Sequence, residues 1–462
     1  MDYSLSVEVF KKNMFVEDGT KIKHSPGKTF KLLPFAANNN IPAVLNLDHV
    51  LGGFICKIRD KEPVDITSEV LFGRIAEETE IEPGQEDVFY EMLRQLFFQK
   101  DGEIRPLNLE LICRTPCSES SERKLADYLI DVLGEKSILK EILDDKETLL
   151  NGNSNVLEHL VISKMEMKDV SDITDLKYYP VTKSLSKSFE SDFSFILSSS
   201  NSIKEYLTRL IEFYYFSYTA QVCLQLDRFL NGDRQSIIPL YFCLDWEKTS
   251  QSRKSYSEGW KKLAESVEHI FAHAIVLEIL NQTESDTAPL DYIALKEMIE
   301  QNADSDATIA EQIRKITSAY REAITDCSEM KELKRERTPL GLSADEIRYL
   351  YKSVKIQFEL KRKRPYDAYA DKYKAFCAKY LKNRGRIGMM LNLTEEMLIF
   401  LTKIVIKDRD QLRLKEVFRG FESRGVFLDD TSKEKVAAYF EKLNLIEKKS
   451  DSGDAKYVKR IL

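Results

Sequence analysis

The chain has 462 residues, with 69 Lys and Arg against 76 Asp and Glu, and therefore a formal net charge of −7. Hydrophobic residues make up 43% and charged residues 31%, which is typical of globular proteins. This length allows roughly two to four domains, and the acidic balance excludes a uniformly basic coat for nucleic acid, so that any such contact must be a local patch. Glycine (17) and proline (12) are scarce, which favours helices over turn-rich β-structure.

Cysteines and apolar stretches indicate the compartment. The seven cysteines are odd in number and scattered, without disulfide-framework or zinc-ligand spacing, so we expect reduced, buried thiols. The first 15 residues alternate polar with apolar side chains and are not typical of a signal peptide. The apolar stretch Phe213–Leu226 is too short to span a bilayer. We therefore expect a cytoplasmic protein that makes no membrane contact.

Residues 1–182 are expected to form a mixed, mostly helical N-terminal domain. Leu5–Phe10 and Lys28–Phe35 look like short extended runs. Glu86–Phe98 and Ser121–Leu133 instead carry apolar residues at helical spacing. The sequence therefore predicts helices with small β elements in this domain.

A serine-rich segment, residues 183–202, precedes a central helical domain at 203–330. Its apolar residues follow no sustained helical period, so we predict a linker or loop there. Ser202 and Glu205 then form a capping box, which predicts the start of a long helix with aromatic residues on nearly every side. Further elements are predicted at Pro239–Leu244 (a short apolar run that fits a strand), Gly259–Leu280, Leu290–Glu300 and Ile309–Thr325.

Residues 331–386 are predicted to be a basic helical segment. In its second part, 352–386, there are 12 Lys and Arg but three Asp and Glu. Two interpretations remain open for these cations: a solvated helix face, or a surface that contacts the phosphates of DNA. The densest part of the segment consists of Lys361, Arg362, Lys363 and Arg364.

Residues 387–462 have the pattern of a winged helix-turn-helix domain. Three short amphipathic helices are predicted, with starts near Thr394, Leu414 and Thr431, and two strand-like runs follow them. In such a domain the third helix enters the major groove of DNA and the hairpin, or wing, follows the phosphates. Docking on another subunit is an equally open use of this fold. The DNA-binding candidates are Lys433, Lys435, Lys448, Lys449, Lys456, Lys459 and Arg460, and the hairpin turn is Ser450, Asp451, Ser452, Gly453 and Asp454.

Two short patterns resemble known ligand motifs but lack essential residues. The Gly27-Lys28-Thr29 run would need a further glycine five positions before Gly27 to cradle phosphates, and that position is Ile22. His269 and His273 have the i, i+4 spacing of zinc ligands, but the intervening glutamate and a third ligand are missing. We therefore expect a simple loop, a buried histidine pair, and neither a metal nor a cofactor.

Asp245, Trp246, Glu247 and Lys248 follow the predicted strand at Pro239–Leu244. Two carboxylates and a lysine at a strand end suggest a divalent-metal nuclease, which binds Mg²⁺ through carboxylates. The usual acidic-x-Lys spacing fails by one position, since a threonine stands two residues after the glutamate. A structural or partner-facing loop is the favoured interpretation, and the nuclease remains the alternative.

Segments from the beginning, middle and end of the chain carry a family resemblance. They are Leu32–Phe35, Leu240–Ser250 with Ser252–Lys254, and Glu416–Gly425 with Lys449–Val458. Together they resemble the DNA phosphorothioation-dependent restriction proteins of the DptG (also DndG) family. The motif contains no catalytic fingerprint. The family-motif residues are Asp245, Trp246, Glu247, Lys248, Ser450, Asp451, Ser452, Gly453 and Asp454.

The resemblance implies a role in bacterial defence. It implies a restriction complex in which F-type and H-type partners carry the NTPase and helicase-like functions. Such a complex attacks double-stranded DNA that lacks sulfur in its backbone and spares phosphorothioate-modified DNA. We therefore expect a non-catalytic DNA-binding or scaffolding subunit. The alternatives are a metal-dependent nuclease subunit using Asp245 and Glu247, and an adaptor that does not contact DNA.

Overall fold

The computed structural model describes residues 3–16, 21–35, 46–100, 102–115, 117, 119–151, 155–171, 176–198, 202–284, 288–301, 305–449 and 455–461. It is 61% helix and 8% strand, which confirms the prediction of a mainly α protein. The chain divides into two compact units. Unit 1 comprises Met1–Ala43, Tyr178–Leu185 and Phe216–Leu462, and unit 2 comprises Val44–Lys177 and Ser186–Tyr215. Within the described ranges, no helix combines the length and apolar character that a membrane crossing requires.

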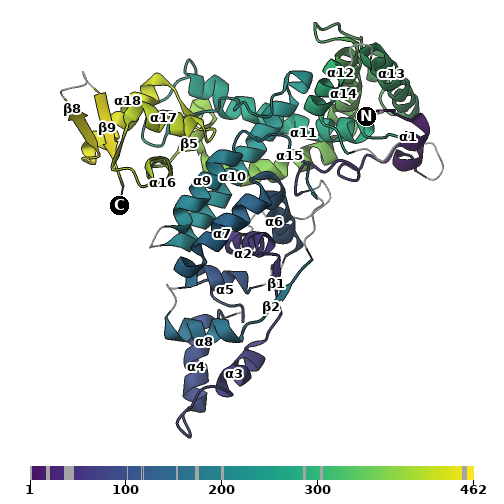
Figure 1. Cartoon of the computed structure of the whole chain (residues 1–462). Coiled ribbons are helices and arrows are strands. Elements are labelled where there is room, and N and C mark those ends of the chain that lie inside the picture. Colours follow the sequence, from purple (N-terminus) through teal and green to yellow (C-terminus); the bar gives the residue numbers. More distant parts are fainter. Residues whose placement is uncertain are drawn as a thin grey trace. The chain divides into compact units, whose positions relative to one another are not determined.

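Unit 2 consists of short helices and a two-stranded antiparallel ribbon (Figure 1). Side chains fix several helix starts: Asn46 accepts from the backbone N–H of Asp48, and Asn108 from that of Leu111. The elements are α2 (Leu47–Ile58), β1 (Lys61–Pro63), α3 (Ser68–Ala76), α4 (Glu86–Phe97), α5 (Leu109–Cys113), α6 (Ser120–Val132), α7 (Lys136–Asn151), α8 (Val156–Lys164), β2 (Met167–Asp169), α9 (Ser186–Leu197) and the first part of α10 (Ile203–Leu226).

Helix α9 stands where the sequence predicted a linker or loop at 183–202. Phe189, Phe193 and Ile196 are spaced along one helix face and are at most 2% exposed. The buried carboxylate of Asp192 accepts a hydrogen bond from Tyr214 Oη at 2.8 Å. The linker prediction is wrong because the serines between these residues conceal the helical period, while burial of the aromatic rings outweighs their weak helix propensity.

Unit 1 contains most of the longer helices and two small sheets. Its helices are α1 (Val7–Met14), the second part of α10, α11 (Lys261–Leu280), α12 (Tyr292–Gln301), α13 (Ser305–Ala323), α14 (Leu342–Leu360), α15 (Lys363–Cys377), α16 (Glu395–Ile406), α17 (Leu414–Glu422) and α18 (Asp430–Lys442). Short helical turns lie at Phe229–Asn231, Tyr256–Trp260, Ser328–Glu332, Ala378–Tyr380 and Gly385–Ile387. Its strands are β3 (Tyr241–Leu244), β4 (Leu381–Asn383), β5 (Met389–Leu393), β6 (Gln411–Arg413), β7 (Phe427–Leu428), β8 (Ile446–Lys449) and β9 (Ala455–Lys459).

The two extended runs predicted near the N-terminus are not strands. Residues 28–35 form bends and irregular backbone. The first run is replaced by α1, which begins after Ser6 because the Ser6 hydroxyl accepts from the backbone N–H of Val9. Phe10 and Met14 then form its buried face. The predicted run has only six residues, and over so short a window the apolar spacing of a helix resembles the alternation of a strand.

The four-stranded sheet joins residues that the sequence assigned to different domains. Its order is β4-β5-β3-β7, with β3 parallel to both neighbours and β4 antiparallel to β5. The register pairs Leu244 of β3 with Leu393 of β5, and Phe242 of β3 with Leu428 of β7. The sheet therefore crosses the boundaries predicted between 203–330, 331–386 and 387–462, so these segments are held together by backbone hydrogen bonds.

The end of the chain combines three helices with a three-stranded antiparallel sheet (Figure 1, yellow). The element order is α16, β6, α17, β7, α18, β8 and β9, and the sheet order is β6-β9-β8. All three predicted helices are thus present. The predicted hairpin turn, residues 450–454, lies outside the described residues.

Candidate functional site

Strand β3 brings the motif residues Asp245–Lys248 to one end of the four-stranded sheet. Phe242, Cys243 and Leu244 are buried, as expected for a short apolar strand between two parallel neighbours. After Leu244 the backbone continues pairing for one residue, because the N–H of Asp245 donates to the carbonyl of Leu393 at 3.1 Å. The chain then leaves the sheet as a loop, residues 245–253, which we name the β3 loop.

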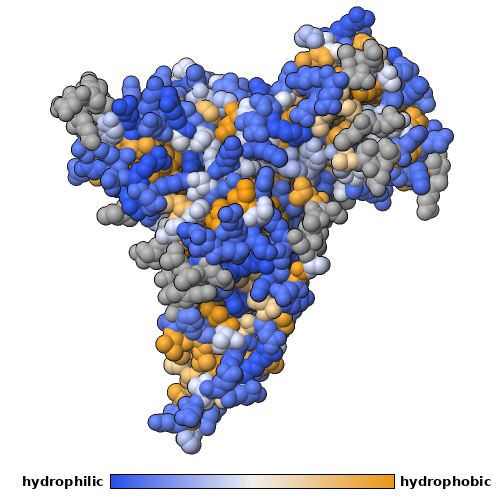
Figure 2. All heavy atoms as spheres, in the orientation of Figure 1, coloured by the Kyte–Doolittle hydropathy of each residue, from blue (hydrophilic) through white to orange (hydrophobic). Residues whose placement is uncertain are grey.

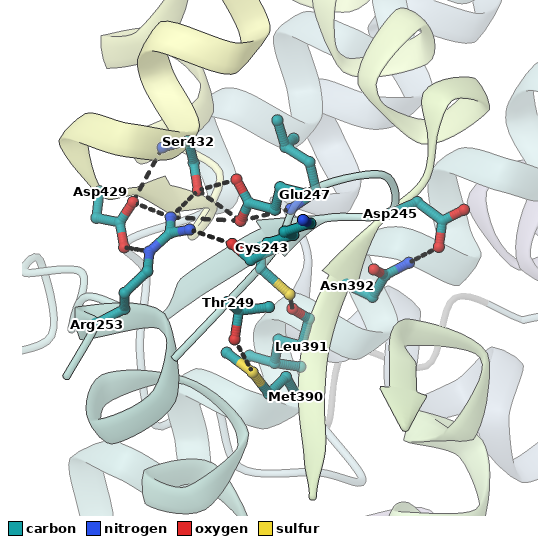
Figure 3. A network of polar contacts seen from close by, with 12 residues as sticks. Cys243, Asp245, Glu247, Thr249, Arg253, Met390, Leu391, Asn392, Asp429 and Ser432 are labelled. Atoms are coloured by element: carbon teal, nitrogen blue, oxygen red, sulfur yellow. Dashed lines mark hydrogen bonds and ion pairs between the residues drawn. The ribbon is translucent and has the colours of Figure 1, made fainter. Parts of the chain in front are cut away.

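Glu247 and Arg253 tie the β3 loop to the first turn of α18 (Figure 3). The Glu247 carboxylate is 1% exposed, forms an ion pair with Arg253 at 3.3 Å, and accepts from Ser432 Oγ at 2.9 Å. Arg253 also donates from Nε to Asp429 at 2.9 Å and from a terminal nitrogen to Ser432 Oγ at 2.8 Å. Burial alone would raise the pKa of Asp429, but the hydrogen bonds from Arg253 and Ser432 outweigh it and lower that pKa.

The other motif residues lie on different sides of the same loop. Asp245 is 45% exposed and accepts from Lys382 Nζ at 2.6 Å, a hydrogen bond that lowers the pKa of Asp245. The ring of Trp246 lies 4.8 Å, centroid to centroid, from Tyr439 of α18. Lys248 is exposed. Trp246 and Glu247 thus face α18, whereas Asp245 faces β4.

The two carboxylates proposed for a nuclease do not converge on one point. Figure 3 shows Asp245 turned toward Asn392, whose Nδ2 lies 3.2 Å from the carboxylate, and Glu247 turned toward Ser432. Glu247 is already balanced by Arg253. No three His, Cys, Asp or Glu side chains of the described chain gather in a way that would bind a metal. A metal-dependent nuclease needs carboxylates that share an ion, so the geometry gives this alternative no support.

Arg384 completes the β3 loop and was not singled out from the sequence. Its guanidinium donates to the carbonyls of Leu244 (2.7 Å), Asp245 (3.2 Å) and Glu247 (3.3 Å), and to Asn392 Oδ1 (2.9 Å). Along the sequence it is one of the 12 cations of residues 352–386. Its role is therefore to hold the loop, and no local pattern distinguishes it from its solvated neighbours.

Ion pairs neutralise half of the densest basic run. Lys361 Nζ lies 2.9 Å from Glu329, and Arg362 Nε lies 2.9 Å from Asp326. Lys363 and Arg364, at the start of α15, are exposed and form no ion pair with any other described residue.

The C-terminal cations divide in the same way. Lys433 pairs with Glu422 at 3.0 Å, Lys456 with Glu441 at 3.0 Å, and Arg460 with Asp408 at 3.3 Å. Lys435 and Lys459 are exposed and have no ion-pair partner in the described part of the chain. For Lys448 and Lys449 the described structure extends to the backbone of β8.

The Gly27-Lys28-Thr29 loop contains a cradle of backbone N–H groups, but the chain fills it with its own carboxylate. The N–H groups of Gly27, Lys28 and Phe30 each donate to Glu278 at 3.2 Å, and that of Thr29 donates at 2.8 Å. Gly27 has a φ of 84°, which opens the loop into this concave shape. Glu278 lies on α11 and is 2% exposed. The loop therefore anchors α11 and does not offer its N–H groups to a nucleotide.

His269 and His273 of α11 both bond to one oxygen of Asp227. Asp227 Oδ1 lies 2.9 Å from His269 Nδ1 and 3.0 Å from His273 Nε2. The remaining ring nitrogens face Lys355 Nζ at 2.9 Å and Tyr292 Oη at 3.0 Å. All four ring nitrogens of the two histidines therefore have a polar partner. The pair is a buried network, as the sequence suggested.

Acidification below about pH 6.5 is expected to destabilise unit 1 through His24 and His273. Burial lowers the pKa of His24 to about 3, and it also lowers the pKa of His273, although the nearby Asp227 opposes the shift of His273. A base with a lower pKa in the folded chain binds fewer protons there, so its stabilisation is present above the ordinary pKa and is lost as pH falls, by at most about 1.4 kcal/mol per pH unit. Urea unfolding at about pH 7.5 and about pH 5.5 measures this, with Trp246 and Trp260 as fluorescent probes within unit 1.

The His273→Gln variant should lose part of that pH dependence, and the double variant His24→Gln with His273→Gln should lose most of it, whereas His159→Gln in unit 2 should retain it. Asp227 does not interfere, although its pKa also changes. Burial would raise the pKa of Asp227, but hydrogen bonds from both histidines lower it, so its contribution is lost below about pH 4. The same pH dependence in the wild type and in the double variant would contradict the prediction.

Residues from three parts of the sequence thus meet here: the β3 loop itself with its motif and Arg253, the β4 region with Lys382 and Arg384, and the start of α18. The arrangement is a polar anchor, since each buried charge has an opposite charge or hydrogen-bond donor beside it. Neither a protein-family model nor a curated protein matches the chain.

Proposed function

We propose that the chain is a non-catalytic DNA-binding or scaffolding subunit of a bacterial phosphorothioation-dependent restriction complex that acts on unmodified DNA. Membership of that complex, with F-type and H-type partners, rests on the resemblance of the segments around Asp245–Lys248 and at the end of the chain. The observation that carries the molecular role is the element order of residues 387–462. Apart from β7, which pairs with β3 between the last two helices, the order of helix, strand, two helices and a hairpin, with β9 between β6 and β8, resembles that of a winged helix-turn-helix.

The contacts of α18 favour docking on another protein over recognition of bases in the major groove of DNA as the role of this module. In helix-turn-helix proteins the N-terminal residues of the third helix approach the base edges. Here Asp429 and Ser432, at that end of α18, are bound by Arg253 and Glu247 of the β3 loop. DNA contact would then depend on the phosphates and on exposed cations without ion pairs. Among the candidate residues whose side chains the structure describes, those cations are Lys363, Arg364, Lys435 and Lys459.

Replacing these four residues with glutamine should weaken binding to a duplex of about 30 base pairs and flatten the slope of log K against log salt. Each phosphate contact adds about 0.9 to that slope, so the expected change is up to about 4. Fluorescence anisotropy between about 50 and 200 mM salt measures the slope.

A matched variant separates the effect of direct phosphate contact from the effect of removing positive charge. Lys361, Arg362, Lys433 and Lys456 are also four cations, but each is in an ion pair. Their replacement with glutamine changes the net charge equally and should change the slope less. Equal effects of the two variants would remove the exposed cations from the proposal. Absence of any wild-type complex at low salt would leave the adaptor role.

Membership of the complex is tested separately. The full chain, co-expressed with F-type and H-type subunits, should co-purify with them through size-exclusion chromatography. A chain that elutes alone, while the other subunits assemble with each other, would contradict the assignment to this system.

A further inference from the structure

Helix α4 of unit 2 has two apolar faces, and one of them is exposed. Leu93 and Phe97 are at most 2% exposed and pack in a cluster with residues of α3 and α8. Val88, Met92 and Leu96 recur at i, i+4 and i+8 on another side of the same helix and are 65%, 38% and 43% exposed. We name these three residues the α4 stripe. Figure 2 shows orange, hydrophobic atoms in the region where Figure 1 labels α4 and α8.

The segment around this stripe holds an unusual concentration of negative charge. Between Asp65 and Phe97 the sequence has nine Asp and Glu against two Arg, a net charge of −7 that equals that of the whole chain. Both arginines are occupied: Arg74 pairs with Glu166 at 3.0 Å, and the Arg94 guanidinium lies over the Phe72 ring at 5.7 Å and within 4.0 Å of the exposed carboxylate of Glu91. The remainder of the chain is therefore balanced, and this part of unit 2 is strongly acidic.

A surface hollow lies on the side of α4 that faces α3. Its volume is about 540 Å³, and its floor contains the stacked rings of Phe72 and Tyr90, whose centroids are 5.6 Å apart. Three carboxylates, those of Glu69, Asp87 and Glu91, line it. At about 100° per residue, Glu91 lies between this hollow and the α4 stripe. The stripe therefore has carboxylates along one flank.

We propose that the α4 stripe and its acidic flank bind a basic amphipathic helix of another protein. An apolar row at i, i+4 and i+8 is the surface that a second helix covers with its own apolar side. Lysine or arginine beside that apolar side then faces Asp87 and Glu91, at the border of the hollow that Phe72, Tyr90 and Arg94 also line.

The charge also decides against other occupants. DNA and anionic lipid surfaces are repelled by a segment with a net charge of −7. A second copy of this chain is a separate outcome of the experiment, because residues 352–386 are basic. The inference concerns unit 2 and does not depend on DNA binding by unit 1.

The test uses the full chain and two labelled peptides of about 18 residues, long enough for five helical turns. One peptide has leucine along one face and lysine elsewhere, and the other has glutamate in place of lysine. We expect fluorescence anisotropy to show saturable binding of the lysine peptide, weakened by salt, and no binding of the glutamate peptide. Equal binding of both peptides, or none of the lysine peptide, would overturn the proposal.

Matched variants locate the binding. Replacing Val88, Met92 and Leu96 with serine should lower the affinity for the lysine peptide roughly tenfold or more. The control replaces Val156 and Leu176, which are 84% and 60% exposed elsewhere in unit 2, with serine and should change the affinity less than about twofold. Equal losses in both variants would overturn the proposal. All of these positions are exposed, and circular dichroism checks that each variant keeps the wild-type helix content.

The contribution of the carboxylates is tested by the double variant Asp87→Asn with Glu91→Gln. This variant should lower the affinity for the lysine peptide about threefold or more at low salt. Its control, Glu62→Gln with Asp169→Asn, removes the same charge from the β1–β2 ribbon and should have a smaller effect. Sedimentation velocity of the chain alone gives the remaining decisive result. Self-association that the three serine substitutions abolish would replace the partner helix with a second copy of the chain.

Discussion

Replacing Glu278 with alanine is expected to lower the free energy of unfolding of unit 1 by about 3–5 kcal/mol. The carboxylate is 2% exposed and is the acceptor for four consecutive backbone N–H groups, from Gly27 to Phe30. Each N–H that is buried without an acceptor costs about 1–3 kcal/mol. The full sum does not apply, because Lys28 and Thr29 are exposed residues whose N–H groups can bind water.

Urea unfolding followed by tryptophan fluorescence measures this effect in unit 1, where both tryptophans lie. Glu278→Gln should have an intermediate effect, because the amide keeps one acceptor oxygen and presents N–H to the other donors. Glu265→Ala is the control: it lies on the same helix, is exposed, and should change stability by less than about 0.5 kcal/mol. Similar losses in Glu265→Ala and Glu278→Ala would contradict the anchoring role.

The Glu278 contact also illustrates what sequence patterns reveal. The motif around Gly27-Lys28-Thr29 was excluded as a phosphate loop because one glycine is absent, yet the loop does form an N–H cradle. What the sequence could not provide is the anion, which lies about 250 residues later on α11. Local geometry follows from the glycine, whereas its partner depends on the tertiary fold.

Elements with a strong local signal were predicted closely. The helix expected at Glu86–Phe98 is found as Glu86–Phe97, and the one expected at Ser121–Leu133 is found as Ser120–Val132. A helix depends on neighbours three and four residues away, so a short window contains the necessary information. The helix at residues 186–197 was not predicted from the sequence, because it is stabilised by the burial of phenylalanines and not by local propensity.

The candidate site was predicted in part, as a set of residues without their partners. Asp245 and Glu247 were identified correctly as close in sequence, but their side chains turn to Lys382 and Ser432, which are 137 and 185 residues away. The basic run was counted by charge alone, and charge does not show which cations are paired. Such pairings follow from sheet order, since the parallel neighbours of β3 bring β4 and α18 to its end.

The Arg253→Ala variant is expected to free the first turn of α18 from the β3 loop, at a cost of about 3–4 kcal/mol. The substitution leaves the Glu247 carboxylate, which is 1% exposed, without its cation, and it removes two hydrogen bonds from Asp429. Hydrogen exchange should show lost protection in α18, while α11 remains protected. The control is Lys248→Ala in the same loop, an exposed residue whose loss should cost less than about 0.5 kcal/mol.

A double variant separates the buried charge from the rest of the contact. Glu247→Gln with Arg253→Met removes both members of the ion pair and should be less destabilising than Arg253→Ala, since no uncompensated charge remains buried. If the double variant loses as much free energy of unfolding as the two single variants together, the two residues are not coupled. The contact between the β3 loop and α18 would then not depend on this ion pair.

The Arg253→Ala substitution also distinguishes between DNA recognition and protein docking as the role of the C-terminal module. Groove reading needs the N-terminal end of α18, which the Arg253, Asp429 and Ser432 contacts cover. If α18 reads DNA, its release should raise duplex affinity despite the loss of a positive charge. If the module is a scaffold, release should leave duplex affinity unchanged or lower and reduce assembly with the F-type and H-type subunits. The contacts of Glu247 and Trp246 with α18 favour the second result, because a helix bound on this side by its own chain is already positioned as part of a fixed surface.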